Sequence, residues 1–192
     1  MPQNRLAFLA TVLMPAIAVV PSSASAAVIT FEDAAEGNLG TYAGVNWNQQ
    51  WTNYSDIQSP YNAKSGKNRV FSANYTNPTA FFFNQDVTFE GAWFSGYDEA
   101  NVSFQLFRDG LQVATSGFLL PSDNPTFLSS GFSGVVDEVR VFAEGGYYVM
   151  DDVTFSSSGA VPEPATWALM ILGFGAVGYS MRRRQKAAVR FA

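Results

Sequence analysis

Carboxylates and aromatic rings are the side chains of this 192-residue chain that could do chemistry or hold a ligand. The sequence contains no histidine and no cysteine. Imidazole bases, Ser-His-Asp triads, histidine-bound zinc and thiolate metal sites are therefore excluded for the chain acting alone. Disulfides are excluded as well, although export would permit them.

Four acidic residues bracket the central part of the chain. Glu32 and Asp33 follow the first β-prone run, and Asp151 and Asp152 lie within the last one. If side chains alternate along Tyr147–Phe155, Asp151 shares a face with apolar residues and Asp152 points the other way. An inward carboxylate needs compensation, because burying an unpaired charge is costly. The alternative for all four is solvent-facing charge at the edge of a sheet.

A second group of candidates is aromatic. The segment from Ala34 to Asn68 is rich in Asn, Gln, Ser, Tyr and Trp, a composition typical of the long loops that often carry function. Aromatic rings can stack on the C–H faces of sugars, so these rings are predicted to bind a glycan; the alternative is that they anchor the loops to the core. The candidates are Trp47, Trp51, Tyr54 and Tyr61.

A pair of carboxylates would also suit a glycoside hydrolase. No spacing in the sequence singles out such a pair, and Asp137 and Glu138 fall on opposite faces of one predicted strand. Glycan binding is therefore favoured, and a secreted glycan-active hydrolase is kept as the alternative. The carboxylates considered for it are Glu90, Asp98, Glu99, Asp137 and Glu138.

The charge of the central part argues against one class of partner. Between residues 27 and 159 there are fifteen acidic residues and only five basic ones. The formal charge of the whole chain, −5, hides this imbalance because it includes the arginines near the C-terminus. Nucleic acid is excluded as a partner, since phosphate binding requires a basic face.

The elements that must position these residues are almost all strands. Asp109-Gly110 between two alternating runs predicts a tight hairpin, and Gly145-Gly146 predicts a second turn. Short antiparallel strands in this number bury their apolar sides by packing two sheets face to face, so we expect an all-β antiparallel β-sandwich of the jelly-roll type. The predicted strands are Val28–Glu32, Val45–Tyr54, Arg69–Tyr75, Ala80–Phe83, Val87–Tyr97, Val102–Arg108, Leu111–Leu119, Val135–Ala143 and Tyr147–Phe155.

The N-terminus has the pattern of a secretory signal peptide over residues 1–26. Arg5 gives a positive start, Leu6–Val20 is apolar, and Pro21 precedes the small-residue cleavage pattern that ends at Ala26. Cleavage is expected after Ala26. The mature sandwich body is then expected to occupy residues 27–159, the size of one domain.

The C-terminal segment, residues 160–192, combines three features in a fixed order. Pro162-Glu163-Pro164 comes first, an apolar run over Ala165–Met181 follows, and the run ends at Arg182, Arg183 and Arg184. Seventeen helical residues extend roughly 25 Å, enough to span a thin hydrocarbon core. A single transmembrane helix is therefore predicted, with its arginines on the cytoplasmic side of the inner membrane.

This tail resembles the PEP-CTERM sorting signal in its PEPxxWA variant, written here as Pro162-Glu163-Pro164-Ala165-Thr166-Trp167-Ala168. The resemblance implies processing by an exosortase, a membrane-embedded enzyme, so that the inner-membrane precursor becomes a cell-surface or extracellular protein. It also implies an association with extracellular polysaccharide and biofilm matrix. An ordinary membrane anchor is the alternative.

The second half of the body resembles galactose-binding-like carbohydrate-binding modules, through FEGAWFSG, VSFQLFRDGLQVAT and VVDEVRVFAEGGYYVMDDVTF between Phe89 and Phe155. That resemblance implies a structural calcium shared by the first and last strands. By position it assigns calcium to Glu32 and Asp151, with Asp33 and Asp152 as further oxygen ligands. The expected function is thus an exported structural or glycan-binding module that is not an enzyme.

Overall fold

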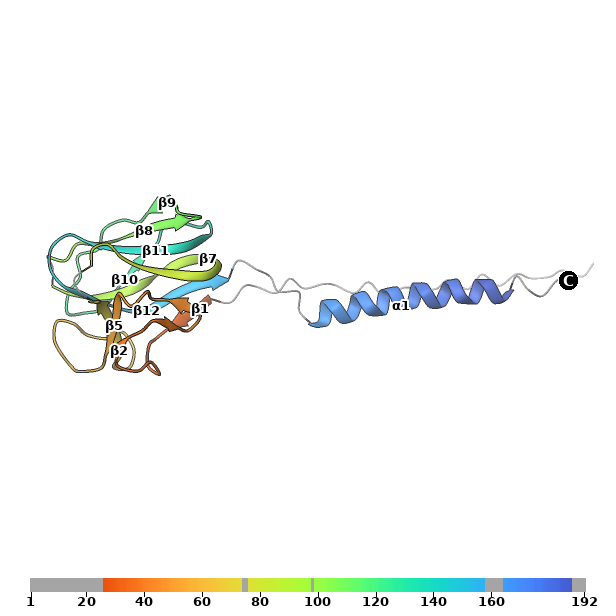
Figure 1. Cartoon of the computed structure of the whole chain (residues 1–192), viewed down its shortest axis with the longest axis horizontal. Helices are drawn as coiled ribbons and strands as arrows, with labels where there is room; N and C mark the ends of the chain where they lie inside the picture. Colours follow the sequence, from red (N-terminus) through yellow and green to blue (C-terminus); the bar gives the residue numbers. More distant parts are fainter. Residues whose placement is uncertain (1–25, 74–75, 98, 158–163, 188–192) are drawn as a thin grey trace, which may run out of the picture.

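The computed structural model describes residues 26–73, 76–97, 99–157 and 164–187. Residues 26–157 form a β-sheet body, and α1 (Pro164–Ala187) follows it (Figure 1). The predicted signal peptide lies outside the described residues except for Ala26. The strands are β1 (Ala26–Ile29), β2 (Gly37–Asn38), β3 (Thr41–Tyr42), β4 (Val45–Asn46), β5 (Trp51–Tyr54), β6 (Arg69–Ser72), β7 (Thr79–Gly96), β8 (Val102–Arg108), β9 (Leu111–Thr115), β10 (Thr126–Ser129), β11 (Val136–Ala143) and β12 (Tyr148–Ser157).

Every strand pair within the described residues is antiparallel, which confirms the all-β antiparallel prediction. The main path of hydrogen-bonded neighbours runs β2-β5-β6-β12-β7-β11-β8-β9. Three further contacts complete the sheet: β1 pairs with β12, β10 pairs with β7, and β4 pairs with β3 and β7. The first and last strands of the body are therefore neighbours, as expected.

The long strand β7 joins the two halves of this sheet. Its first part pairs with β11 through residues such as Phe81 and Phe82, and its second part pairs with β12 up to Gly96. The sequence predicted two strands here, Ala80–Phe83 and Val87–Tyr97, separated by the polar residues 84–86. The chain instead stays extended through them, and one sheet of 12 strands encloses the core.

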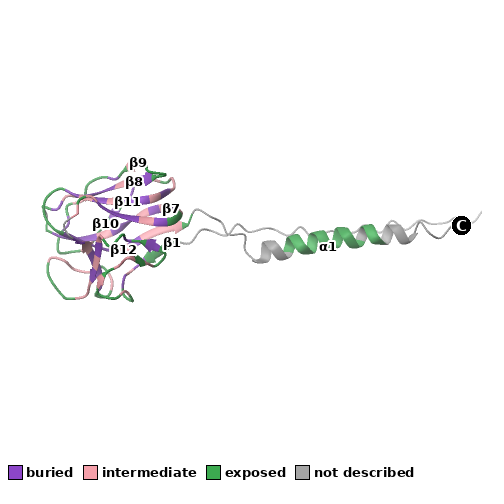
Figure 2. Cartoon of the chain, viewed as in Figure 1, coloured by how far each residue is buried: buried purple, intermediate pink, exposed green. Residues whose placement is uncertain are grey.

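Figure 2 shows buried residues on most of the long strands of the body. The core that they form is strongly aromatic. Its residues all lie between Ile29 and Val153, and the side chains described in α1 are exposed. The body thus has a hydrophobic core of its own, and residues 27–157 form a folding unit that does not need α1. The largest fully buried side chains are Trp47, Trp51, Phe31, Phe81, Phe89, Phe94, Phe104, Leu106 and Met150.

The hairpin predicted at Asp109-Gly110 is confirmed. Arg108 pairs with Leu111 across a two-residue turn, and the two central residues have φ angles of 51° and 75°. Positive φ at both positions is the requirement of a primed hairpin turn, whose twist matches that of the strands it joins.

Candidate functional site

The acids at the two ends of the body converge on one loop, residues 55–68. Asp151, on β12, is 2% exposed. Its Oδ2 accepts hydrogen bonds from the backbone N–H groups of Lys64 (2.8 Å) and Ser65 (3.0 Å), and its Oδ1 accepts one from Asp152 N–H (2.7 Å). The predicted inward orientation is confirmed, and the compensation that a buried carboxylate requires comes from three amides.

Glu32 holds the same loop from the other end of the body. Its Oε1 accepts from the N–H groups of Lys67 (2.9 Å) and Asn68 (2.7 Å). A Cβ at Gly66, where φ is +51°, would lie 2.1 Å from Glu32 Cδ, so the carboxyl group occupies the space that a larger residue would need. Glu32 and Asp151 thus clamp the 55–68 loop by its backbone.

The remaining two predicted ligands have local partners. Asp152 Oδ1 accepts from the Ser65 hydroxyl at 2.7 Å. Asp33 accepts from the Tyr42 hydroxyl, and this bond together with burial raises the pKa of Tyr42. Each of these two carboxylates is thus bound to a nearby hydroxyl group, Asp152 to Ser65 and Asp33 to Tyr42.

The ionisation of Asp151 reflects its burial. Loss of solvent raises the pKa of this carboxyl to about 7, and the nearby charge of Asp152 acts in the same direction. The hydrogen bonds from the N–H groups of Ser65, Asp152 and Lys64 oppose this by stabilising the charged form.

This donor arrangement does not match the predicted calcium site. Among the described residues, no group of three or more acidic side chains lies close enough together to hold a metal ion. The amide hydrogen bonds also direct Glu32 Oε1 and Asp151 Oδ2 toward the backbone of the 55–68 loop. Calcium binding by Glu32, Asp33, Asp151 and Asp152 remains a prediction without support in this geometry.

The two tryptophans of the aromatic group belong to the core. Trp47 and Trp51 are each 0% exposed, and both pack against Phe81 with ring centroids 4.9 and 6.1 Å away. Trp51 Nε1 donates to Ala80 O at 2.9 Å, and Trp47 Nε1 donates to Tyr42 O at 3.2 Å. They present no face to a sugar and act as core anchors, the alternative that the sequence left open.

We expect Trp51→Phe to lower the free energy of unfolding by about 2 kcal/mol, because it shrinks a buried ring and leaves Ala80 O without its side-chain donor. Glycan binding, measured on the same preparation, should not change. Loss of binding in a variant that still melts cooperatively would contradict the core assignment of Trp51.

Tyr54 and Tyr61, in contrast, line a cleft of about 970 Å³. The lining also includes Tyr147, which is 58% exposed, and Tyr148 at the start of β12. Burial raises the pKa of Tyr54 and Tyr61, so their hydroxyls stay neutral donors and acceptors at ordinary pH. The other lining residues are Glu36, Gly37, Thr52, Asn53, Gln58, Phe71, Ser72, Thr76, Asn77, Ala143, Gly145, Gly146 and Val149.

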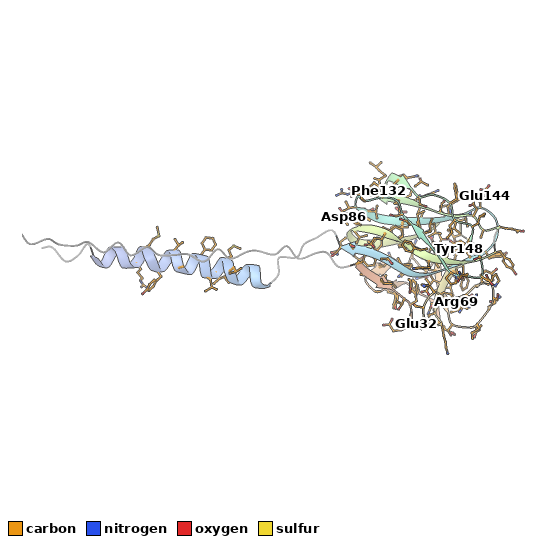
Figure 3. The ribbon with its side chains drawn as sticks, turned by 180° about the vertical axis from the view of Figure 1, so that it is seen from behind. Glu32, Arg69, Asp86, Phe132, Glu144 and Tyr148 are labelled. Atoms are coloured by element: carbon orange, nitrogen blue, oxygen red, sulfur yellow. The ribbon has the colours of Figure 1, made fainter. Side chains whose placement is uncertain are left out.

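Arg69 sets the positions of both tyrosines. It is 2% exposed, and its guanidinium lies 4.0 Å from the ring centroid of Tyr54. Its Nε donates to Tyr61 O (2.6 Å), one terminal nitrogen donates to Lys67 O (2.9 Å), and the other donates to Asp56 O. Figure 3 shows Arg69 and Tyr148 on the same part of the body. One buried cation therefore fixes both ends of the 55–68 loop.

Sequence reasoning missed Glu36, Asn53, Gln58 and Tyr147 as cleft residues. The first three lie in the polar and aromatic segment that was predicted to carry function, so composition gave the region but not the side chains. Tyr147 follows the predicted Gly145-Gly146 turn, and only the pairing of β12 with the rest of the sheet shows that this turn faces the 55–68 loop.

The described acids considered for hydrolysis are scattered. Glu90 accepts from Ser156 at 2.6 Å, Asp137 accepts from Asp109 N–H at 3.0 Å, and Glu138 accepts from Arg140 Nε at 2.5 Å. Asp98 lies outside the described residues, and neither Glu90, Asp137, Glu138 nor Glu99 lines the tyrosine cleft.

The tail is helical from Pro164 to Ala187, and the predicted span Ala165–Met181 falls inside α1. The described side chains of α1 are exposed, including Ile171 and Phe174. No helix among the described residues has the length and hydropathy needed to cross a membrane. Trp167, Ala168 and Arg182–Arg184 lie within α1, whereas Pro162 and Glu163 lie outside the described residues.

Comparison with known proteins finds similarity in the tail. No curated protein and no solved structure is significantly similar to this chain. The likeness of the body to jelly-roll and galactose-binding-like modules therefore stays a prediction. Residues 160–184, which include Pro162-Glu163-Pro164 and the arginines, match the PEP-CTERM protein-sorting motif.

Proposed function

We propose that this chain is an exported protein, held at the inner membrane as a precursor and processed by an exosortase-type enzyme, whose body binds extracellular glycan in the tyrosine-lined cleft. The PEP-CTERM motif at residues 160–184 supports the sorting part. The exposed apolar side chains of α1 support contact with lipid or with a membrane enzyme, either of which would cover them. The cleft supports the binding part.

The chemistry of the cleft suits a sugar. Tyr54, Tyr61 and Tyr147 offer rings for stacking on C–H faces, while Gln58 and Thr52 offer amide and hydroxyl groups. A site that combines aromatic surface with a few polar groups in a concave surface is the usual form of a small-ligand site. This combination is the observation that carries the binding proposal.

The place of the cleft in the fold suits display from a membrane. Tyr148, at the start of β12, lines the cleft, whereas Ser157, at its end, leads into the tail. The ten residues of β12 cover about 30 Å at the rise of a strand. Asp86 marks the end of the body that carries the tail, because it precedes Val87, which pairs with Ser157. In Figure 3, Tyr148 and Asp86 lie at different ends of the body. Tyr148, and with it this part of the cleft lining, thus lies at the end of β12 that is far from the tail.

Binding is proposed in preference to hydrolysis. Glycoside hydrolysis uses two carboxyl groups about 5–10 Å apart. The described residues that line the cleft include one carboxyl group, that of Glu36. A single carboxylate can orient or select a bound sugar, but the two-carboxylate mechanism has no second member among these residues.

We expect the exported form to lack the tail. Intact-mass spectrometry of protein from the medium of its natural host should show an N-terminus near Ala27 and loss of the residues after the Pro162-Glu163-Pro164 motif. Replacing Arg182, Arg183 and Arg184 by neutral residues should reduce this processing, because positive charge beside a span fixes its orientation. Protein recovered only from membranes, with Arg182–Arg184 intact, would identify a plain anchored protein instead.

We expect Tyr61→Ala and Tyr147→Ala each to weaken glycan binding by roughly three- to tenfold, the effect of losing one stacking contact. The loss of binding is measured as the fraction of the body (residues 27–157) that insoluble cellulose, chitin and chitosan remove from solution. Phe118→Ala is the control, since Phe118 is an aromatic residue 62% exposed outside the cleft. If the wild type and all variants are removed from solution equally, or if none of them is removed, the cleft is not a glycan site.

A further inference from the structure

One wall of the cleft offers hydrogen-bond acceptors. Glu36, which precedes β2, is exposed, and its carboxylate accepts from the Ser55 hydroxyl while keeping further lone pairs for a ligand. Asn53, on β5, is 1% exposed, and its Oδ1 has no hydrogen-bond donor among the described residues. Glu36 and Asn53 belong to one wall, because Gly37 pairs with Asn53 across β2 and β5.

The orientation of the Asn53 amide is fixed by its other end. Nδ2 donates to Ala34 O (3.1 Å) and Ala35 O (3.3 Å), so a flipped amide would place its oxygen against two carbonyls. Oδ1 must therefore remain the unpaired atom. A buried acceptor without a partner is unfavourable, but this atom is enclosed by protein, so the exposed acceptor at this wall is the Glu36 carboxylate.

The cation nearest to the cleft is not available to an anion. Arg69 is buried, and each of its three guanidinium nitrogens donates to a backbone carbonyl. None of the described residues that line the cleft is a lysine or an arginine. The body as a whole is strongly acidic, so carboxylated or sulfated sugars meet repulsion without a local counter-charge.

We propose that the cleft selects glycans that carry free amino groups, with the Glu36 carboxylate as the specificity-determining residue. This inference rests on the proposed glycan-binding function and names its ligand class. A protonated sugar amine donates to the Glu36 carboxylate with charge assistance. The tyrosines stack on the sugar rings and supply the binding that does not depend on charge.

The test uses three hexasaccharides that share one backbone, β-1,4-linked glucose units, and differ only at the second carbon. Cellohexaose has a hydroxyl there, the chitin hexamer has an acetamide, and the chitosan hexamer has an amine. Oligogalacturonate serves as an anionic comparison. Titration calorimetry of the body is performed at low salt and mildly acidic pH, where the amine carries its charge.

The chitosan hexamer should bind roughly three- to fivefold more tightly than the other two, the range of an exposed ion pair. Glu36→Gln should remove this preference, so that this variant binds the chitosan hexamer no more tightly than it binds cellohexaose. Asp109→Asn is the matched control: it removes the same charge at a site whose side chain is 83% exposed and outside the cleft, and it should keep the preference. Added salt should weaken chitosan binding most.

The outcomes separate the two proposals. If all three hexamers bind equally, or if oligogalacturonate binds best, the amino-sugar preference is overturned while the glycan cleft stands. If Asp109→Asn reduces the preference as much as Glu36→Gln, the effect comes from net charge and the assignment of Glu36 is overturned. If no oligosaccharide binds and Tyr61→Ala changes nothing, the glycan-binding function itself fails.

Discussion

Replacing Asp151 by alanine should lower the free energy of unfolding of the body by about 3–6 kcal/mol. The substitution leaves the N–H groups of Lys64, Ser65 and Asp152 without their acceptor, and each buried unpaired donor costs about 1–3 kcal/mol. Such a loss is a large part of the stability of a single domain. Denaturant unfolding of residues 27–157 measures it. Asp152→Asn is the control, since it retains a side-chain oxygen for the Ser65 hydroxyl and should cost under about 1 kcal/mol.

Asp151 also gives the stability of the body a characteristic pH dependence. This carboxyl ionises near pH 3.8 when unfolded and near 7 when folded. The folded body therefore holds a proton that the unfolded chain releases, and this contribution is full below about pH 3.8 and lost as the pH rises through 7. One pKa unit corresponds to about 1.4 kcal/mol, so the free energy of unfolding should fall by up to about 4 kcal/mol between these pH values. Asp151→Asn should flatten the slope. An increase in stability over the same interval, present in the wild type and absent in the variant, would show that the three amides outweigh burial.

Replacing Arg69 by methionine should both destabilise the body and abolish glycan binding. Three carbonyl oxygens, those of Asp56, Tyr61 and Lys67, lose their donor, at a cost of about 3 kcal/mol or more. The 55–68 loop keeps its bonds to Glu32 and Asp151 but loses those at Asp56 and Tyr61, and the Tyr54 ring loses the cation that packs on it. Denaturant unfolding and depletion by polysaccharide measure the two effects on one preparation.

Two further variants test whether this role belongs to the guanidinium group. Arg69→Lys keeps the charge but cannot reach three carbonyls in a planar arrangement, so an intermediate loss is expected. Arg108→Met removes a surface arginine whose partner Asp86 lies 2.7 Å away, and it should change the free energy of unfolding by under about 1 kcal/mol. Normal glycan binding by an Arg69→Met variant that remains folded would contradict the positioning role.

The parts of this structure that depend on local pattern could be predicted from the sequence. The apolar residues around Asp151 predicted that its side chain faces inward, and Asp109-Gly110 predicted a primed hairpin. The hairpin follows from two residues, because turn geometry is a local property. Strict alternation does not hold in β12, where Val149, Met150 and Asp151 are all buried. The tail motif, also a local pattern, was predicted with its residues.

The parts that depend on distant contacts could not be predicted. Asp151 and Lys64 are 87 residues apart, so the sequence indicated that the carboxylate needs compensation but not that a loop backbone supplies it. Composition likewise could not separate Trp51, which lies in the core, from Tyr61, which lines the cleft, because both belong to one polar and aromatic segment. The unbroken course of β7 depends on pairing with β11 and β12 on either side of its polar residues.

Mapping of the bound sugar on the body distinguishes the tyrosine-lined cleft from every other surface of the body. Nitrogen-labelled residues 27–157 are titrated with the cellulose, chitin and chitosan hexamers, and amide chemical-shift changes are followed by NMR. If the cleft binds the sugar, the changes are concentrated at residues that line it, namely Glu36, Thr52–Tyr54, Gln58, Tyr61 and Gly145–Val149. Changes centred elsewhere, for example on Phe127 and Phe132, or an absence of changes with all three hexamers, would contradict glycan binding in the cleft.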